Sequence, residues 1–138
     1  MNRAFLKKVL LRIGLAFFVG TLVFLVHQEF RASAGEQKTA ENQVRAIALY
    51  RSGFNKAKVF LYHQAIADFN QAIQLDPNFA EAYTARAYAK YLIGDKSKAI
   101  EDFRSAERVY TETGSHEKAR IASELREDFQ KELINSNK

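Results

Sequence analysis

The sequence predicts an all-helical (all-α) protein in which two helix–turn–helix units are stacked behind a separate N-terminal segment. Residues 65–72 (AIADFNQA) return thirty-four residues later as residues 99–106 (AIEDFRSA), with Ala, Ile, Asp, Phe and Ala in register. A fixed period of this length is the signature of stacked supersecondary units. The 138 residues contain only one Pro and six Gly, which favours helices over strands and turns. The first 34 residues differ from the rest in charge and hydropathy.

The N-terminal segment, residues 1–34, has the pattern of a targeting sequence. Its first twelve residues contain four cations and no acid, and residues 13–26 (IGLAFFVGTLVFLV) then carry no charge. In one interpretation residues 9–26 form an uncleaved signal anchor, because a helix of this length measures about 27 Å, close to a ~30 Å hydrocarbon core. In the other, the segment is a signal peptide cleaved after Ala34, because Ala32-Ser33-Ala34 fits the small-x-small cleavage pattern.

Both interpretations give the same topology, since the basic flank stays in the cytoplasm and the rest of the chain crosses. We therefore expect a single-pass membrane protein with a cytoplasmic N-terminus and its C-terminal domain on the exoplasmic or periplasmic side. Cleavage would instead give a periplasmic or secreted protein. From Gly35 onward the chain has 16 basic and 15 acidic residues, so the net charge of +5 comes mainly from the leader and does not indicate nucleic-acid binding.

The rest of the chain divides into four segments. Residues 35–45 are assigned to a linker and the start of the first helix, because RASAGEQK (31–38) is small and polar. Residues 46–79 and 80–113 are the two repeat units, and residues 114–138 form a closing helix. Within each unit, the short alanine side chains should leave space between the helices for one large phenylalanine ring. This ring belongs to Phe69 in the first unit and to Phe103 in the second. Gly53, which weakens its helix, predicts the close approach of a second helix.

The repeat resembles the tetratricopeptide repeat (TPR). The first unit matches it at Gly53, Ala65, Phe69, Ala72 and Pro77, and the second at Tyr83, Ala87, Gly94-Asp95, Ala99, Phe103 and Ala106. The resemblance covers residues 46–113, half of the chain. Phe60-Leu61 depart from it, because they occupy the turn where the second unit has Gly94-Asp95. The resemblance implies a TPR-like α-solenoid fragment whose first helices line a concave, peptide-binding face.

Carried over by position, the resemblance places the partner-binding residues on that face. They are Tyr50, Arg51, Phe54 and Lys58 from the first unit, and Glu81, Thr84, Tyr88 and Tyr91 from the second. The aromatic residues would be the anchors, because their rings give a large contact area at a low entropic cost. Each of them has packing between helices as its alternative role. The family's chaperone-tail binders clamp a terminal carboxylate with Lys, Asn and Arg, and Tyr50 and Phe54 occupy the corresponding first-repeat places here, so that subclass is not expected.

No constellation of residues points to catalysis. The chain has no Cys, and His27, His63 and His116 fall in different elements. No two of these residues have the short spacing that metal ligands on one element usually show. Asp68 and Asp102 recur once per unit, which favours a structural role over a catalytic pair. We therefore expect no enzyme activity, cofactor, metal or small-molecule substrate.

The sequence thus predicts a membrane-tethered module that binds a partner peptide or protein. The alternatives are a soluble periplasmic or secreted adaptor and an accessory subunit of a membrane complex. Stacked units bury their faces only against neighbours. The closing helix covers one end of the stack, and the other end lies near residues 44–51. We therefore expect that this end self-associates or is covered by a partner or by the membrane.

Overall fold

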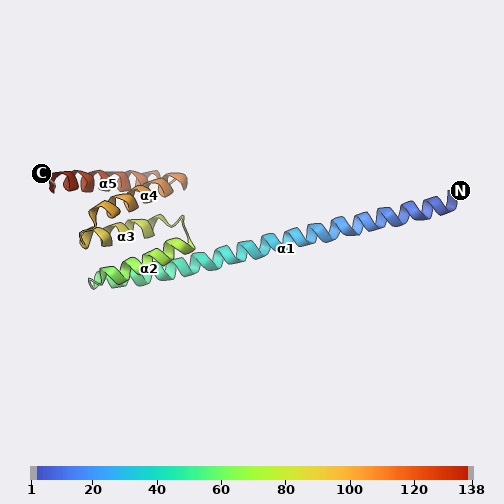
Figure 1. Ribbon diagram of the computed structural model, residues 1–138, viewed down its shortest axis with the longest axis horizontal. Helices are drawn as coiled ribbons and strands as arrows, with labels where there is room; N and C mark the ends of the chain where they lie inside the picture. Colours follow the sequence, from blue (N-terminus) through green and yellow to red (C-terminus); the bar gives the residue numbers. More distant parts are fainter. Residues whose placement is uncertain (1–2, 137–138) are drawn as a thin grey trace. The chain divides into compact units, whose positions relative to one another are not determined.

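The computed structural model describes the backbone of residues 3–136 and the side chains of residues 21, 23–26, 28–29 and 36–136. In this range the chain is helical apart from short turns, and the all-helical prediction is confirmed. The helices are α1 (Arg3–Lys58), α2 (Tyr62–Leu75), α3 (Ala80–Leu92), α4 (Lys96–Glu112) and α5 (His116–Ser136), shown in Figure 1.

The chain divides into two compact units, Met1–Ala40 and Glu41–Lys138. The backbone is helical throughout residues 35–45, the segment assigned to a linker and the start of the first helix, and the boundary between the two units falls within it. The physical reason is that residues 31–38 contain Arg, Ala, Glu, Gln and Lys, which are good helix formers, and no Pro. The single Gly35 costs only about 1 kcal/mol relative to Ala, which does not end a helix.

The sequence-predicted anchor, residues 9–26, has most of its side chains outside the described residues. Among the side chains that are described, no helix combines the length and the hydropathy needed to cross a bilayer.

The second unit is a stack in which each helix packs on the next one along the chain, from α2 through α5 (Figure 1). The C-terminal part of α1 joins the stack through Gly53, where an added Cβ would lie 2.7 Å from Cε1 of Phe69. Phe69 and Phe103 are 1% and 0% exposed, respectively, as predicted. Ala65 and Ala89 pack with Phe69, and Ala65, Ala72, Ala99 and Ala106 are fully buried in the stack. The small side chains let the helices approach closely, while the phenylalanines fill the space between them.

Candidate functional site

A hollow of about 350 Å³ lies between α1, α2 and α3, and we call it the apolar groove. Its lining is aromatic and aliphatic apart from one cation, and consists of Phe54, Ala57, Lys58, Tyr62, Phe69, Ala85, Tyr88, Ala89 and Leu92. The buried Phe69 and Ala89 form its floor, while Phe54, Tyr88 and Leu92 are partly exposed around it. A concave, largely apolar site of this size has room for a few side chains of a bound segment.

The repeat explains why these residues meet. Phe54 and Tyr88 are thirty-four residues apart, and so are Lys58 and Leu92, so each pair occupies one position in successive units. Within each helix the two residues are four apart and therefore share a face. The short side chains of Ala57, Ala85 and Ala89 leave the space between the larger ones open.

The groove carries positive charge. The ammonium of Lys58 lies 4.8 Å from the ring centroid of Phe54, a cation–π distance. Lys58 forms no ion pair with a described residue, whereas Lys56, two residues earlier in α1, is paired with Asp68 at 2.6 Å. Partial burial raises the pKa of the Tyr88 hydroxyl, so it stays protonated and can donate a hydrogen bond at neutral pH.

A second hollow, of about 230 Å³, lies between α3, α4 and α5 and is lined by Glu81, Thr84, Tyr110, Lys118, Ile121, Ala122 and Leu125. Lys118 pairs with Glu81 across it at 2.8 Å. Burial acts to raise the pKa of Glu81, but the hydrogen bond from Lys118 and other favourable contacts hold that pKa below its usual value. The Thr84 hydroxyl donates to the carbonyl of Ala80 at 3.2 Å, within its own helix. This hollow is therefore closer to neutral than the apolar groove.

The structure separates the sequence-predicted binding residues into groups. It brings Phe54, Lys58 and Tyr88 together at the apolar groove, and Glu81 and Thr84 at the second hollow. Arg51 is exposed on α1. That these residues bind a partner stays a prediction.

Tyr50, Tyr88 and Tyr91 take part in packing between helices, and the Tyr88 ring lies edge-on to that of Phe103 at 5.2 Å. The ring of Tyr50 lies 5.0 Å from that of Phe79 and 5.9 Å from that of Phe69. Tyr91 stacks on Phe129 of α5 at 4.3 Å and donates a hydrogen bond to Glu132 at 2.7 Å. Their rings have a structural function, which was the alternative for each aromatic residue.

Sequence reasoning missed Leu92, Tyr62 and Lys118 as lining residues. The period could have identified two of them, because Leu92 follows Lys58 by thirty-four residues and Lys118 follows Thr84 by the same interval. Tyr62 had no such signal, since it directly follows the irregular turn at Phe60.

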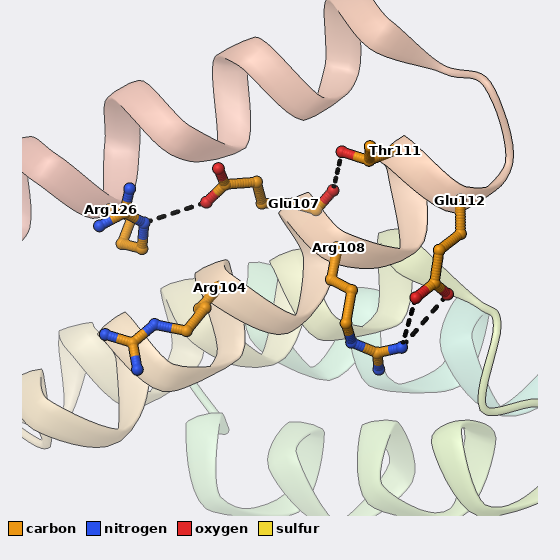
Figure 2. Close-up of a pocket in the computed structure, with 6 residues that line it drawn as sticks. All are labelled: Arg104, Glu107, Arg108, Thr111, Glu112 and Arg126. Carbon is orange, nitrogen blue, oxygen red and sulfur yellow. Dashed lines mark hydrogen bonds and ion pairs between the residues drawn. The ribbon is translucent and has the colours of Figure 1, made fainter.

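Another hollow, of about 590 Å³, is lined by charged side chains of α4 and α5 (Figure 2). Arg126 donates to Glu107 at 3.0 Å and so connects the two helices, while Arg108 pairs with Glu112 within α4 at 3.0 Å. These carboxylates already neutralise their arginines, and the surface has the character of a solvated ion-pair network.

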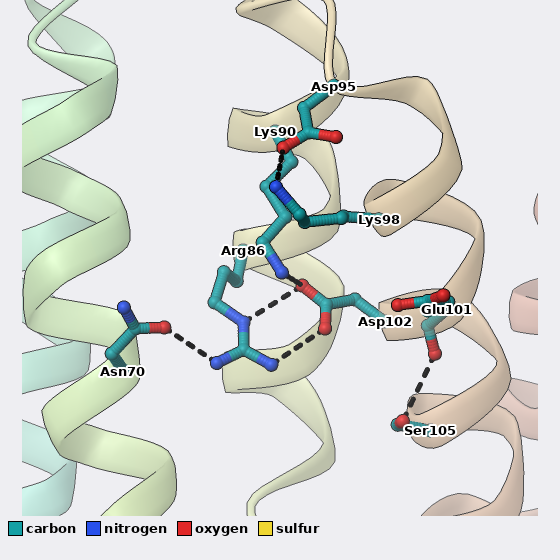
Figure 3. A network of polar contacts seen from close by, with 8 residues as sticks. All are labelled: Asn70, Arg86, Lys90, Asp95, Lys98, Glu101, Asp102 and Ser105. Carbon is teal, nitrogen blue, oxygen red and sulfur yellow. Dashed lines mark hydrogen bonds and ion pairs between the residues drawn. The ribbon is translucent and has the colours of Figure 1, made fainter.

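Asp68 and Asp102 each pair with a lysine of the preceding helix. Arg86 donates two hydrogen bonds to Asp102, at 2.7 and 2.8 Å, and a third to Asn70 at 2.6 Å (Figure 3). Lys90 pairs with the same carboxylate at 2.8 Å, as Lys56 does with Asp68 one repeat earlier. These contacts connect α2, α3 and α4, and give the recurring aspartates a structural role. Among the described residues, no cluster of His, Cys, Asp and Glu is placed to hold a metal ion.

Comparison with known proteins agrees with this architecture. Residues 62–94, which contain α2 and α3, match the family model described as a TPR repeat. Mouse tetratricopeptide repeat protein 36 is 40% identical over 72 residues, which are 52% of this chain and 37% of that protein. The chain thus spans little more than a third of the length of this curated relative.

Among solved structures, the chain is similar to the TPR domains of yeast Sti1. The TPR2B domain, in a complex with pHsp70, matches with a TM-score of 0.60 and 28% identity over 64% of this chain and 70% of that chain. The TPR2AB domain, in a complex with pHSP90, matches with a TM-score of 0.59 and 29% identity over 62% and 33% of the two chains. The chain is therefore similar to a TPR repeat over residues 62–94 and has an all-helical, TPR-like solenoid fold.

Proposed function

We propose that residues 41–138 are a non-catalytic protein-binding module, and that the apolar groove holds a segment of a partner protein. The groove itself carries the proposal, because it is a concave apolar surface with one cation and no carboxylate in its lining. Removing an apolar surface from water is favourable, so apolar side chains of a partner would gain free energy by binding there. The similarity to Sti1 domains that were solved in complexes supports the same use of the fold.

The groove proposal is tested by capturing partners with the full-length chain and a crosslinker. Phe54→Ala and Leu92→Ser remove apolar area from partly exposed positions of the groove, so they should not unfold the stack. We expect each to reduce recovery of the specific partners by about tenfold, corresponding to about 1.4 kcal/mol of binding energy. Ile134→Ala is the control, since Ile134 is an exposed residue of α5 that does not line the groove. If both groove variants keep the same partners at the same yield, the groove is not the binding site.

We further propose that residues 9–26 tether the module to a membrane, with the module on the exoplasmic or periplasmic side. The support is the uncharged run of residues 13–26 behind a basic flank. N-terminal sequencing of the mature protein tests the tether. An intact Met1 together with resistance to alkaline extraction is expected, whereas a chain that begins at Gly35 would identify a soluble adaptor. Stoichiometric copurification with other membrane subunits in detergent would identify the accessory-subunit alternative.

A further inference from the structure

The turns that follow α1, α3 and α4 have the same hydrogen-bond pattern. Leu61 N–H donates to the carbonyl of Lys56 at 3.0 Å, Asp95 N–H to Lys90 at 2.9 Å, and Ser115 N–H to Tyr110 at 2.8 Å. In each turn the preceding residue has a positive φ. The later two turns have glycine at that position, Gly94 (φ 87°) and Gly114 (φ 74°), but the first has Phe60 (φ 63°).

Phe60 is therefore an outlier in its own structure. A bulky side chain in the left-handed region is strained, and glycine removes that strain at the equivalent positions of the later turns. The fold gains little from the ring, because it is 78% exposed and its ring contact is an edge-on one with Tyr62 at 6.2 Å. Backbone strain that the fold does not need is a reason to look for a function at that residue.

The neighbours of Phe60 make the turn an apolar projection. Val59, Phe60 and Leu61 are consecutive and are 61%, 78% and 45% exposed. This projection, residues 59–61, which we call the apolar turn, is continuous with the apolar groove. Lys58 precedes it and Tyr62 follows it, and both line the groove. The turn and the groove are therefore adjacent, and the ring of Phe60 lies 6.2 Å from that of Tyr62 in the lining of the groove.

The stretch of α1 and α2 that contains the turn carries charges of one sign. Residues 42–67 contain no Asp or Glu but four cations, Arg45, Arg51, Lys56 and Lys58. Asp68 neutralises Lys56, while no ion pair with a described residue neutralises Lys58 beside the turn. Carboxylates of a partner are therefore complementary to the rim of this surface, and additional cations are not.

We propose that the apolar turn and the apolar groove together bind an acidic amphipathic segment of the partner protein. Apolar side chains of that segment pack on Phe60 and Leu61 and enter the groove, and one of its carboxylates pairs with Lys58. The inference deepens the proposed function and rests on it. It assigns Phe60 and Lys58 as residues that determine which partner segments are accepted.

The charge requirement is tested with short, terminally blocked, fluorescein-labelled peptides and the full-length chain. One peptide alternates glutamate with leucine and phenylalanine, and its matched counterpart has lysine in place of glutamate. By fluorescence anisotropy, the acidic peptide should bind at least about tenfold more tightly than the basic one. Lys58→Glu should reverse this preference, while Lys131→Glu, which changes an exposed lysine of α5, should not. Equal binding of the two peptides, or a preference unaffected by Lys58→Glu, would overturn the proposal.

The role of the strained residue is tested with Phe60→Gly. This change supplies the residue that the later turns use, so the melting temperature should stay the same or rise. Binding of the acidic peptide should nevertheless weaken by about tenfold, a combination that a purely structural residue would not give. A melting temperature well below that of the wild type, or unchanged binding, would contradict the assignment of Phe60.

The controls separate this inference from the proposed function. If Phe54→Ala and Leu92→Ser abolish partner binding while Phe60→Gly and Lys58→Glu do not, the groove is used and the apolar turn is not. Self-association that Phe60→Gly abolishes would show that a second copy occupies the surface. Binding of anionic phosphatidylglycerol vesicles that depends on Phe60 would instead make a lipid surface the occupant. Either result overturns the proposal.

Discussion

Gly53 sets the distance between α1 and α2, because the ring of Phe69 lies against its Cα. A methyl group there would be 2.7 Å from Cε1 of Phe69 and 3.1 Å from the carbonyl oxygen of Ala65. Alanine would improve helix propensity by about 1 kcal/mol. Moving a fully buried phenylalanine in a packed core, however, costs about 1–3 kcal/mol.

We therefore predict that Gly53→Ala lowers the free energy of unfolding by up to about 2 kcal/mol, instead of raising it by the propensity gain. Urea denaturation of the full-length chain measures the change. Ala48→Gly, at an exposed position of the same helix, is the reference for propensity alone. If Gly53→Ala stabilised the protein by the amount that Ala48→Gly destabilises it, the close contact would have no energetic consequence.

Asp102 and Asp68 occupy equivalent positions but have unequal partners. Asp102 faces both Arg86 and Lys90, whose side chains are 16% and 15% exposed, whereas Lys56 opposite Asp68 is 33% exposed and can turn into water. Asp102→Ala leaves two cations without a carboxylate, so it should cost about 3–5 kcal/mol. Asp68→Ala should cost about 1–2 kcal/mol. Equal losses in denaturant unfolding would show that the extra contact of Arg86 contributes nothing.

The Asp68 pair also predicts a dependence of stability on pH. Burial acts to raise the pKa of Asp68, but hydrogen bonds from Lys56 and Ser52 outweigh it, and the pKa is below its usual value. A carboxyl group with a lowered folded-state pKa stabilises the protein above its unfolded pKa, about 4, and this contribution is lost as the pH falls through the folded value. The melting temperature should therefore fall on acidification below about pH 4. Asp68→Asn and Lys56→Met should both reduce that dependence, and an unchanged slope in both variants would disprove its assignment to this pair.

At the scale of the elements, the helix ends show what local signals can and cannot predict. Gly94 and Gly114 end their helices with the positive φ that glycine favours, so those ends follow from the sequence. The turn that follows α1 has no glycine, and its position at Phe60-Leu61 was inferred from the thirty-four-residue period alone. Residues 31–38 were expected to be a hinge because they are small and polar, yet their composition is also compatible with a helix. Polarity alone does not end a helix, whereas Pro77, Gly94 and Gly114 do.

The candidate site was predictable where it depends on the repeat. Phe54, Lys58 and Tyr88, which line the apolar groove, were named because the resemblance to the TPR places their positions on one face of the stack. The packing role of Tyr50 depends on Phe79, and that of Tyr91 depends on Phe129 of α5. The position of α5 against α3 is set by tertiary contacts, which the thirty-four-residue period does not encode. The apolar turn was likewise noted only as a departure from the repeat.

At the scale of the whole second unit, residues 41–138, each helix is stabilised mainly by its neighbours. The last helix, α5, therefore keeps the apolar face of the preceding helix out of water. α5 covers Ala106, Val109 and Tyr110 of α4 through Ala119 and Ala122. Phe129 of α5 also contacts the ring of Phe103 at 5.2 Å. Exposing two or three large side chains costs about 4–8 kcal/mol, which is comparable with the whole stability of a small domain.

We therefore predict that a chain truncated after Thr113 loses cooperative thermal unfolding. Circular dichroism at increasing temperature measures this as a broad, non-cooperative decrease in helical signal. Truncation after Glu132 is the control, because it retains Ala119, Ala122 and Phe129. A sharp transition near the wild-type temperature after the larger truncation would mean that the first four helices of the unit are stable without their cover.

The lysine–aspartate bridge that recurs from Lys56–Asp68 to Lys90–Asp102 has a consequence for how such a chain can grow. A duplicated block of residues 76–109 would bring its own bridge, its own glycine turn, its own phenylalanine and the Pro77 turn that ends the preceding helix. Inserted after Val109, it would leave the sequence from Tyr110 through α5 unchanged at the end of the array. Array length can therefore change by gene duplication without a new kind of helix boundary, and each added unit would lengthen the protein while adding its own interface to the stack.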